Sequence, residues 1–172
     1  KKEFYFGLQG LSGSGKTSLA KKIFPIIKKK YGPTIHLDGD SLRKVMNLSG
    51  FSFSERLSNT RIYNKLIKLI TDQNINVVIS LVGLMDEPRI WNKRNIKKYI
   101  EIYIKSDVRK IVKKDKKKIY KKKKDVVGLN IKPEFPKTPD IIIKNKFDKN
   151  LDYLKLDLLN KLSKVMKKKK YF

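Results

Sequence analysis

The segment GLSGSGKTSLA, residues 10–20, carries Gly10, Gly15, Lys16 and Thr17 at the spacing G-x-x-x-x-G-K-[ST]. In a loop of this kind, backbone N–H groups surround nucleotide phosphates, the lysine neutralises their charge and the hydroxyl ligates Mg²⁺. The residues predicted to bind ATP here are Gly13, Ser14, Gly15, Lys16, Thr17 and Ser18. The motif predicts binding of ATP with Mg²⁺, and it leaves open which group receives the phosphate.

Two carboxylates in the segment LDGDSLR come next. Asp38 and Asp40 follow an expected strand, TIHLD, so they should project toward the phosphate-binding loop. Carboxylates there could hold the water shell of Mg²⁺ and accept the proton of an attacking hydroxyl. The alternative is an Asx-type turn that caps a helix beginning at Ser41. Arg43, one turn further, could contact a phosphate or carboxylate.

The segment GFSFSERLSNTR, residues 50–61, combines aromatic and polar side chains. Arg56 and Asn59 are three residues apart, so one helix face could offer a guanidinium and an amide to a nucleotide. Phe51, on the loop before that helix, could stack on a base. The alternative interpretation is an ordinary amphipathic helix whose apolar side packs against the core.

The hydrophobic pattern predicts strands that alternate with helices. The expected strands are residues 3–8, 34–38, 76–83, 99–105 and 140–145, and the expected helices are 16–30, 54–72 with Ser54 as N-cap, 86–97, a short one after Asp107, and one from Leu151. This alternation predicts a three-layer α/β/α P-loop NTPase fold, with a central parallel sheet of about five strands. Pro25 should kink or shorten the first helix.

Composition narrows the class of protein further. A chain of 172 residues suits one domain, expected over 1–172, and the absence of cysteine excludes disulfides, thiolate catalysis and cysteine-based zinc sites. We expect a cytoplasmic protein, because nothing in a chain without cysteine points to an oxidising compartment, and no membrane partner, because no apolar run reaches about 20 residues. The formal net charge of +27 would attract polyanions.

Lysine is concentrated in one segment. In residues 110–124 ten of fifteen positions are Lys, which packing does not explain, because a buried unpaired ammonium is too costly. A basic nucleic-acid-binding P-loop protein is therefore an alternative of another class. Nucleic acid is the less expected partner, because Tyr120 is the only aromatic residue interleaved with these lysines.

The succession GLSGSGKTSLA, LDGDSLR, GFSFSERLSNTR, DKKKIYKKK and PEFPKTPDIII resembles the adenylylsulfate kinases up to about residue 144. The resemblance implies transfer of the γ-phosphoryl group of ATP to the ribose 3′-hydroxyl of a nucleotide with a second acidic group at its 5′ end. It implies Lys16 and Asp38 as catalytic residues, and Thr17 with Asp38 as the magnesium site. The acceptor-binding residues that it implies are Asp40, Arg43, Phe51, Arg56 and Asn59.

The same resemblance gives the lysine run a role. The family's lid, R-D-x-K-G-L-Y-x-K, corresponds to a lid over roughly residues 110–139 here. Lys114 stands at the lid arginine and is expected at ATP, while Lys117 and Lys122 are expected over the acceptor. A homodimer is a reasonable expectation for such a kinase.

The chain also departs from the family pattern at the acceptor site. SLVGLM replaces S-x-I-S-P-Y, so Val82 and Gly83 should line a changed acceptor site. Val126 replaces a phenylalanine that, with the counterpart of Phe51, sandwiches adenine. Losing one stacking face costs a purine about 1–3 kcal/mol. A variant in this group phosphorylates cytidine diphosphoramidate for capsule decoration, and the chain looks more like that variant, with adenylylsulfate as the alternative acceptor.

Overall fold

The structure, a computed structural model, describes residues 3–114, 118, 120–122 and 124–171, with the backbone alone at Lys122. Its elements are β1 (Tyr5–Gln9), α1 (Lys16–Tyr31), β2 (Thr34–Asp38), α2 (Gly39–Val45), α3 (Phe53–Asp72), β3 (Asn76–Leu81), α4 (Asp86–Asn95), β4 (Tyr99–Lys105), α5 (Val108–Lys113), the 3-10 turn η1 (Tyr120–Lys122), β5 (Ile141–Lys144) and α6 (Leu151–Lys168). None of the helices in these described segments is long and apolar enough to span a membrane.

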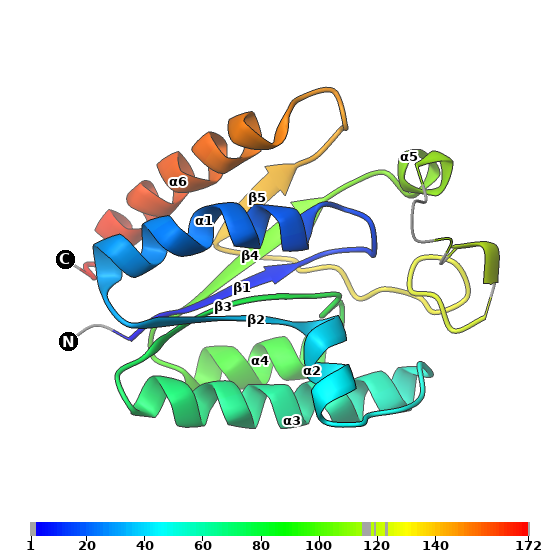
Figure 1. The fold of residues 1–172 in the computed structure, drawn as a ribbon, viewed down its shortest axis with the longest axis horizontal. Helices are drawn as coiled ribbons and strands as arrows, with labels where there is room; N and C mark the ends of the chain where they lie inside the picture. Colours follow the sequence, from blue (N-terminus) through cyan, green and yellow to red (C-terminus); the bar gives the residue numbers. More distant parts are fainter. Residues whose placement is uncertain (1–2, 115–117, 119, 123, 172) are drawn as a thin grey trace.

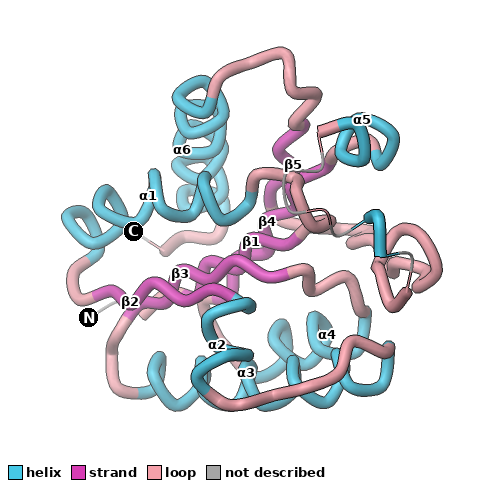
Figure 2. Tube along the Cα trace, turned by 45° about the vertical axis from the view of Figure 1, so that its right-hand side comes forward, coloured by secondary structure: helices cyan, strands magenta, loops and turns pink. Residues whose placement is uncertain are grey.

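The five strands form one parallel sheet in the order β2-β3-β1-β4-β5. Helices α1 and α6 cover one face, and α3 and α4 cover the other (Figures 1 and 2). The predicted three-layer α/β/α arrangement with a parallel sheet of about five strands is confirmed. All five strands end at the same edge, where the loops that carry the candidate site residues meet.

Side-chain alternation along β1 divides the core into two layers. Phe4, Phe6 and Leu8 are buried in the layer shared with α1 and α6. Tyr5 points to the opposite face and packs in the layer that contains Ile67 of α3. Because β1 is covered on both sides, its run of apolar residues needs no polar face.

A third apolar cluster lies at the carboxyl edge of the sheet. It joins the loop after β1, the end of β4, α5 and the segment after η1, through Leu11, Leu84, Tyr103, Ile111, Tyr120, Val126 and Val127. The irregular segment from 124 to 140 is therefore attached to the core, although its residues belong to no helix or strand. This attachment positions that segment beside the candidate site.

Two local expectations need correction. Pro25 was expected to kink or shorten the first helix; the shortening is wrong, because α1 continues to Tyr31, and a kink stays a prediction. Pro25 and Lys21 are both exposed, so the carbonyl group that lacks a partner can bind water, while buried Ile23 and Ile27 hold the helix on the sheet.

The second correction concerns the start of α3. Ser52, and not Ser54, is the N-cap. The Ser52 hydroxyl accepts a bond from the Glu55 amide, and the Glu55 carboxylate accepts one of 3.0 Å from the Ser52 amide. This reciprocal capping box satisfies two backbone donors, whereas a cap at Ser54 would satisfy fewer.

Candidate active site

The phosphate-binding loop connects β1 to α1 at the carboxyl edge of the sheet. Gly15 is the N-cap of α1 and has φ 92°, a left-handed conformation that favours glycine. Its carbonyl group accepts a 3.0 Å hydrogen bond from the Leu19 amide. The N-terminal amides of α1 therefore remain directed toward the loop, which is the arrangement that binds phosphate.

An open cavity of about 820 Å³ surrounds this loop. Its lining includes six of the seven residues predicted to bind ATP, namely Gly13, Gly15, Lys16, Thr17, Ser18 and Lys114. Ser14 is the exception, because it is fully buried beneath the loop and its amide donates to the Leu11 carbonyl at 3.1 Å. A contact between Ser14 and ATP stays a prediction.

Lys16 and Thr17 are held by hydrogen bonds to neighbouring segments. The Lys16 ammonium donates to the Leu11 carbonyl at 3.1 Å, which folds the side chain back over the loop. The Ser80 hydroxyl donates to Thr17 Oγ1 at 3.2 Å. Ser80 is also the register partner of Asp38 on β2, so Thr17 and Asp38 both neighbour Ser80. Hydroxyl and carboxylate oxygens are ligands that suit Mg²⁺ beside nucleotide phosphates.

The Asp38 carboxylate caps α2. Its Oδ1 accepts bonds from the Asp40 and Ser41 amides at 3.0 and 3.2 Å, and its Oδ2 accepts one from the Ser41 hydroxyl at 2.5 Å. The Asx-type alternative is thus present in the structure. Burial acts to raise the pKa of Asp38, but these hydrogen bonds outweigh it and lower the pKa below its usual value. Asp38 is therefore ionised near neutral pH, and its part in catalysis stays a prediction.

Sequence reasoning missed three residues around the ATP cavity. Asn145, just after β5, donates from Nδ2 to the Ser14 carbonyl at 2.9 Å. The Tyr120 hydroxyl donates to the Ser12 carbonyl at 2.7 Å. Phe147 lines the cavity, and the Lys114 ammonium lies 5.0 Å from its ring centroid. The position of Asn145 was a usable signal, because it follows a strand that ends at this edge.

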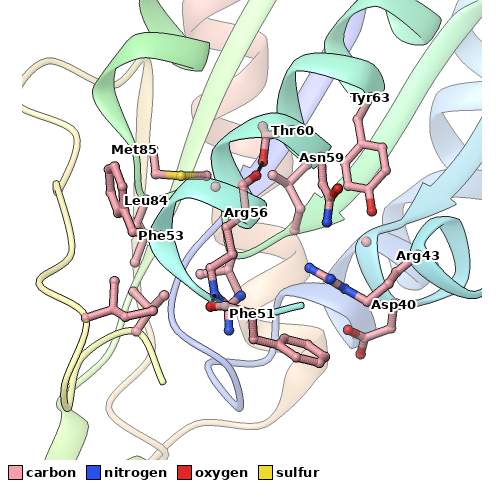
Figure 3. Close-up of a pocket in the computed structure, with 16 residues that line it drawn as sticks. Asp40, Arg43, Phe51, Phe53, Arg56, Asn59, Thr60, Tyr63, Leu84 and Met85 are labelled. Atoms are coloured by element: carbon pink, nitrogen blue, oxygen red, sulfur yellow. Dashed lines mark hydrogen bonds between the residues drawn. The ribbon is translucent and has the colours of Figure 1, made fainter. Parts of the chain in front are cut away.

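A second cavity, of about 70 Å³, lies between α2, α3 and the loop after β3 (Figure 3). Seven predicted acceptor-binding residues line it together: Asp40, Arg43, Phe51, Arg56, Asn59, Val82 and Gly83. Two further predictions fall in the lysine run, where Lys117 lies outside the described residues and the side chain of Lys122 is likewise not described. All predicted acceptor-binding residues whose side chains the structure describes therefore line this one cavity.

Two guanidinium groups dominate the charge of this acceptor cavity. Arg43 donates to the Gly50 carbonyl at 2.5 Å, and Arg56 donates to the carbonyl groups of Phe51 and Asp125 at 2.7 and 2.9 Å. Burial, and then the neighbouring Arg43, lower the pKa of Arg56 from its usual value, although a guanidinium stays protonated in proteins. Because the guanidinium groups of Arg43 and Arg56 are both positively charged and line the same cavity, the cavity favours an anionic ligand.

The turn after β3 replaces the family's Ser-Pro-aromatic element. Gly83 has φ 54°, and a Cβ there would lie 2.7 Å from a Leu81 methyl group, so this turn favours glycine. Arg89 of α4 donates to the Gly83 carbonyl at 3.1 Å and pairs with Glu101 at 3.0 Å. Both charged residues are buried. Arg89 was missed because nothing in the pattern of α4 marks one arginine as buried.

Val126 does not occupy the place expected for it. It is 5% exposed and packs in the third cluster, while Val127 and Ile131 line the acceptor cavity. The interpretation that Val126 faces the acceptor base across from Phe51 is therefore wrong in this structure. Val127, one position further along, belongs to the same cluster and also lines the acceptor cavity, so it makes the aliphatic wall instead.

The parallel α/β/α sheet, the phosphate-binding loop at β1 and the adjoining basic cavity define a P-loop kinase, a phosphotransferase with an alcohol group as acceptor. The family model of adenylylsulphate kinase matches residues 2–144. The chain belongs to the adenylylsulfate kinase family.

Individual relatives agree with this assignment. The chain is 31% identical over 150 residues to a cytidine diphosphoramidate kinase of Campylobacter jejuni, and the alignment covers 84% of this chain and 88% of that protein. It is 32% identical over 161 residues to an adenylyl-sulfate kinase of Prochlorococcus marinus, covering 89% and 80%. Its fold is similar to the Mycobacterium tuberculosis adenylylsulfate kinase solved with AMPPNP and APS, with TM-score 0.82, 24% identity and coverage of 94% and 98%.

Proposed function

We propose that this kinase transfers the γ-phosphoryl group of ATP to the ribose 3′-hydroxyl of cytidine 5′-diphosphoramidate. The observation that carries the proposal is the acceptor cavity, where Arg43 and Arg56 lie beside the Phe51 ring, 4.3 and 5.3 Å from its centroid. An aromatic ring suits a base, and two guanidinium groups suit the acidic 5′ end of an activated nucleotide.

Two features support cytidine as the base. The segment after η1 lines the cavity with the aliphatic residues Val127 and Ile131. Aliphatic side chains offer less stacking surface than an aromatic ring, and a pyrimidine needs less of that surface than a purine. The Campylobacter jejuni relative, at 31% identity, is a cytidine diphosphoramidate kinase. We place the activity in the cytoplasm and in the synthesis of a capsule phosphoramidate.

The ATP side of the reaction needs positioning and charge neutralisation. The amides of the phosphate-binding loop and the N-terminus of α1 bind the phosphates, and Lys16 neutralises negative charge that develops during transfer. Mg²⁺ that enters with ATP would offset charge on the β- and γ-phosphates, and Thr17 with Asp38, directly or through water, would be its protein partners. Lys114 borders the same cavity and is well placed to contact the nucleotide.

On the acceptor side, Asp40 holds the ribose with Arg43 nearby, the guanidinium groups of Arg43 and Arg56 face the acidic 5′ end, and Asn59 and Phe51 bind the rest of the nucleotide. The 3′-hydroxyl then attacks the γ-phosphorus in line with the departing ADP oxygen, and the ionised Asp38 accepts the hydroxyl proton as the bond forms. No covalent enzyme intermediate is needed.

Residues 110–139 act as a lid in this proposal. The segment borders both cavities, since Ile111 and Lys114 line the ATP cavity and Val127 and Ile131 line the acceptor cavity. The amide of Glu134 donates to the Leu84 carbonyl at 3.0 Å, which fixes its far end to the acceptor wall. Lys117 and Lys122 of this segment remain proposed contacts to the acceptor.

Steady-state ADP release tests the choice of acceptor. With Mg²⁺ and ATP fixed, we compare kcat/KM for cytidine 5′-diphosphoramidate and for adenylylsulfate. The proposal predicts a clear preference for the cytidine compound. A preference for adenylylsulfate would instead assign the chain the activity of its Prochlorococcus marinus relative, and no turnover with either acceptor would contradict nucleotide 3′-phosphorylation.

A further inference from the structure

Two buried polar groups of α3 face the acceptor cavity without a partner. Asn59 is 6% exposed and Tyr63 is 4% exposed, and both line the cavity. Within the described part of the chain, neither Asn59 Nδ2 nor the Tyr63 hydroxyl has a hydrogen-bond partner. Buried polar atoms in folded proteins are nearly always hydrogen-bonded, so two orphaned atoms in one cavity indicate groups that a ligand satisfies.

The neighbouring polar side chains of α3 are satisfied within the protein. The Thr60 hydroxyl donates to the Arg56 carbonyl at 2.7 Å, and Asn64 Nδ2 donates to the Pro88 carbonyl at 3.1 Å. The lack of a hydrogen-bond partner is therefore specific to Asn59 and Tyr63 among these polar side chains, and it is not a general property of this helix face.

Asn59 and Tyr63 are four residues apart on α3, so their side chains are neighbours on one helix face. Figure 3 shows the Asn59 carboxamide and the Tyr63 hydroxyl directed toward the side of the cavity where Arg43 and Asp40 lie. Burial raises the pKa of Tyr63, so its phenol is neutral near pH 7 and can both donate and accept. Asn59 Nδ2 can only donate.

We propose that Tyr63 is a specificity-determining residue of the acceptor site, which together with Asn59 binds a group that presents a hydrogen-bond acceptor next to an N–H donor. This inference rests on the proposed function. The ligand atom that accepts would pair with Asn59 Nδ2, and the N–H would pair with the Tyr63 oxygen. A sulfate group offers acceptors only, so it can accept a hydrogen bond from the Tyr63 hydroxyl but cannot donate one to the Tyr63 oxygen.

Two parts of the proposed acceptor have this chemistry. The cytosine edge carries its 4-amino group next to the acceptor N3. The phosphoramidate end carries an amino group next to phosphoryl oxygens. The cytosine edge and the phosphoramidate end each present a hydrogen-bond donor beside an acceptor. Analogues that replace one of the two amino groups at a time show which end Tyr63 binds.

The test is Tyr63→Phe, which removes only the hydroxyl. The acceptors are cytidine 5′-diphosphoramidate, cytidine 5′-diphosphate, which lacks the terminal amino group, and uridine 5′-diphosphoramidate, which exchanges the donor and acceptor positions of the base edge because it has O4 and N3–H where cytidine has its 4-amino group and N3. We expect kcat/KM for the first to fall about tenfold, with KM for ATP unchanged. The preference over cytidine 5′-diphosphate disappears if Tyr63 binds the terminus, and the preference over the uridine compound disappears if it binds the base.

Several controls decide the inference. Tyr153→Phe, at an exposed tyrosine of α6, should change nothing. Calorimetric titration of the three nucleotides into both proteins, with a non-hydrolysable ATP analogue present, measures the same preferences without turnover. If the wild-type protein transfers no phosphate, the proposed function is contradicted, but the role of Tyr63 is not, because the calorimetric titrations still measure whether Tyr63 determines which nucleotide binds. Unchanged preferences in Tyr63→Phe, or an equal loss for all three nucleotides, would overturn the role of Tyr63.

Discussion

The Arg43 guanidinium lies over the Phe51 ring, with its Cζ 4.3 Å from the ring centroid. The ring is half exposed, and it precedes the capping box that starts α3. The capping box and the bond from Arg43 to the Gly50 carbonyl hold the loop that presents this ring. A cation and an aromatic surface are thereby combined in one wall of the acceptor cavity.

Replacing Phe51 tests whether that wall binds the acceptor base. Phe51→Ala should raise the acceptor KM roughly 5- to 150-fold, because one stacking contact contributes about 1–3 kcal/mol. The KM for ATP should stay within a factor of two of wild type. Tyr153→Ala, which truncates an exposed aromatic residue on α6, is the matched control. An unchanged acceptor KM would remove Phe51 from the binding site.

Replacing Lys16 tests whether this lysine has a specific catalytic role or contributes only to the general positive charge of the chain. Lys16→Met should lower kcat by about 100-fold or more, because a positioned charge at the transferring phosphoryl group is lost. Lys21→Met, an exposed position of the same helix, should leave kcat unchanged. Initial rates at saturating ATP and acceptor measure both. Equal rates for the two variants would mean that bulk charge, and not Lys16, supports turnover.

Asp38 predicts a particular pH profile. Because hydrogen bonds hold its folded pKa below the ordinary aspartate value, the carboxylate stays ionised from about pH 8 to pH 5, and this group should cause no loss of kcat/KM there. Its contribution to stability is fully present above the unfolded pKa and is lost as the pH falls through the folded pKa. An acidic limb of the profile centred near pH 6 would contradict this expectation.

The matching variant is Asp38→Asn. Asparagine is a good N-cap, so α2 should keep its start and the protein should remain folded. Turnover should fall below detection while ATP binding, measured by calorimetry, changes little. Turnover equal to wild type would show that the proton goes elsewhere.

The buried pair of Arg89 and Glu101 predicts a large stability effect. Arg89→Met leaves the Glu101 carboxylate buried with Lys93 as its remaining ion-pair partner among the described residues. Breaking a buried pair costs about 3 kcal/mol, which corresponds to a fall of roughly 6–12 °C in Tm at this chain length. Arg61→Met breaks the exposed pair with Glu87 and should shift Tm little. Similar shifts for both variants, by calorimetry or circular dichroism, would contradict the buried pairing.

Much of this architecture could be predicted from the sequence. The strand at Thr34–Asp38 and the strand at Tyr99–Lys105 have the predicted bounds, because short apolar runs between helical patterns determine them. Seven residues that the resemblance to the adenylylsulfate kinases implies for the acceptor site line one cavity, and their binding of the acceptor stays a prediction.

The remaining details depend on contacts between distant segments. The roles of Tyr120 and Asn145 depend on hydrogen bonds to the phosphate-binding loop, 108 and 131 residues away in sequence. The choice between Val126 and Val127 depends on how the segment after η1 packs against the core, because both valines belong to the third cluster and only Val127 lines the cavity. Tyr63 has the spacing of a core residue and is indeed buried, so only the missing partner of its hydroxyl reveals a binding role.

The position of the transferred phosphate tests the central claim most directly. Wild-type protein is incubated with ATP, Mg²⁺ and cytidine 5′-diphosphoramidate, and the nucleotide product is examined by two-dimensional ¹H–³¹P NMR. The account predicts a new phosphomonoester coupled to the ribose H3′, formed in equal amount to ADP. A phosphate at any other position, or ATP hydrolysis to inorganic phosphate with the nucleotide unchanged, would contradict it.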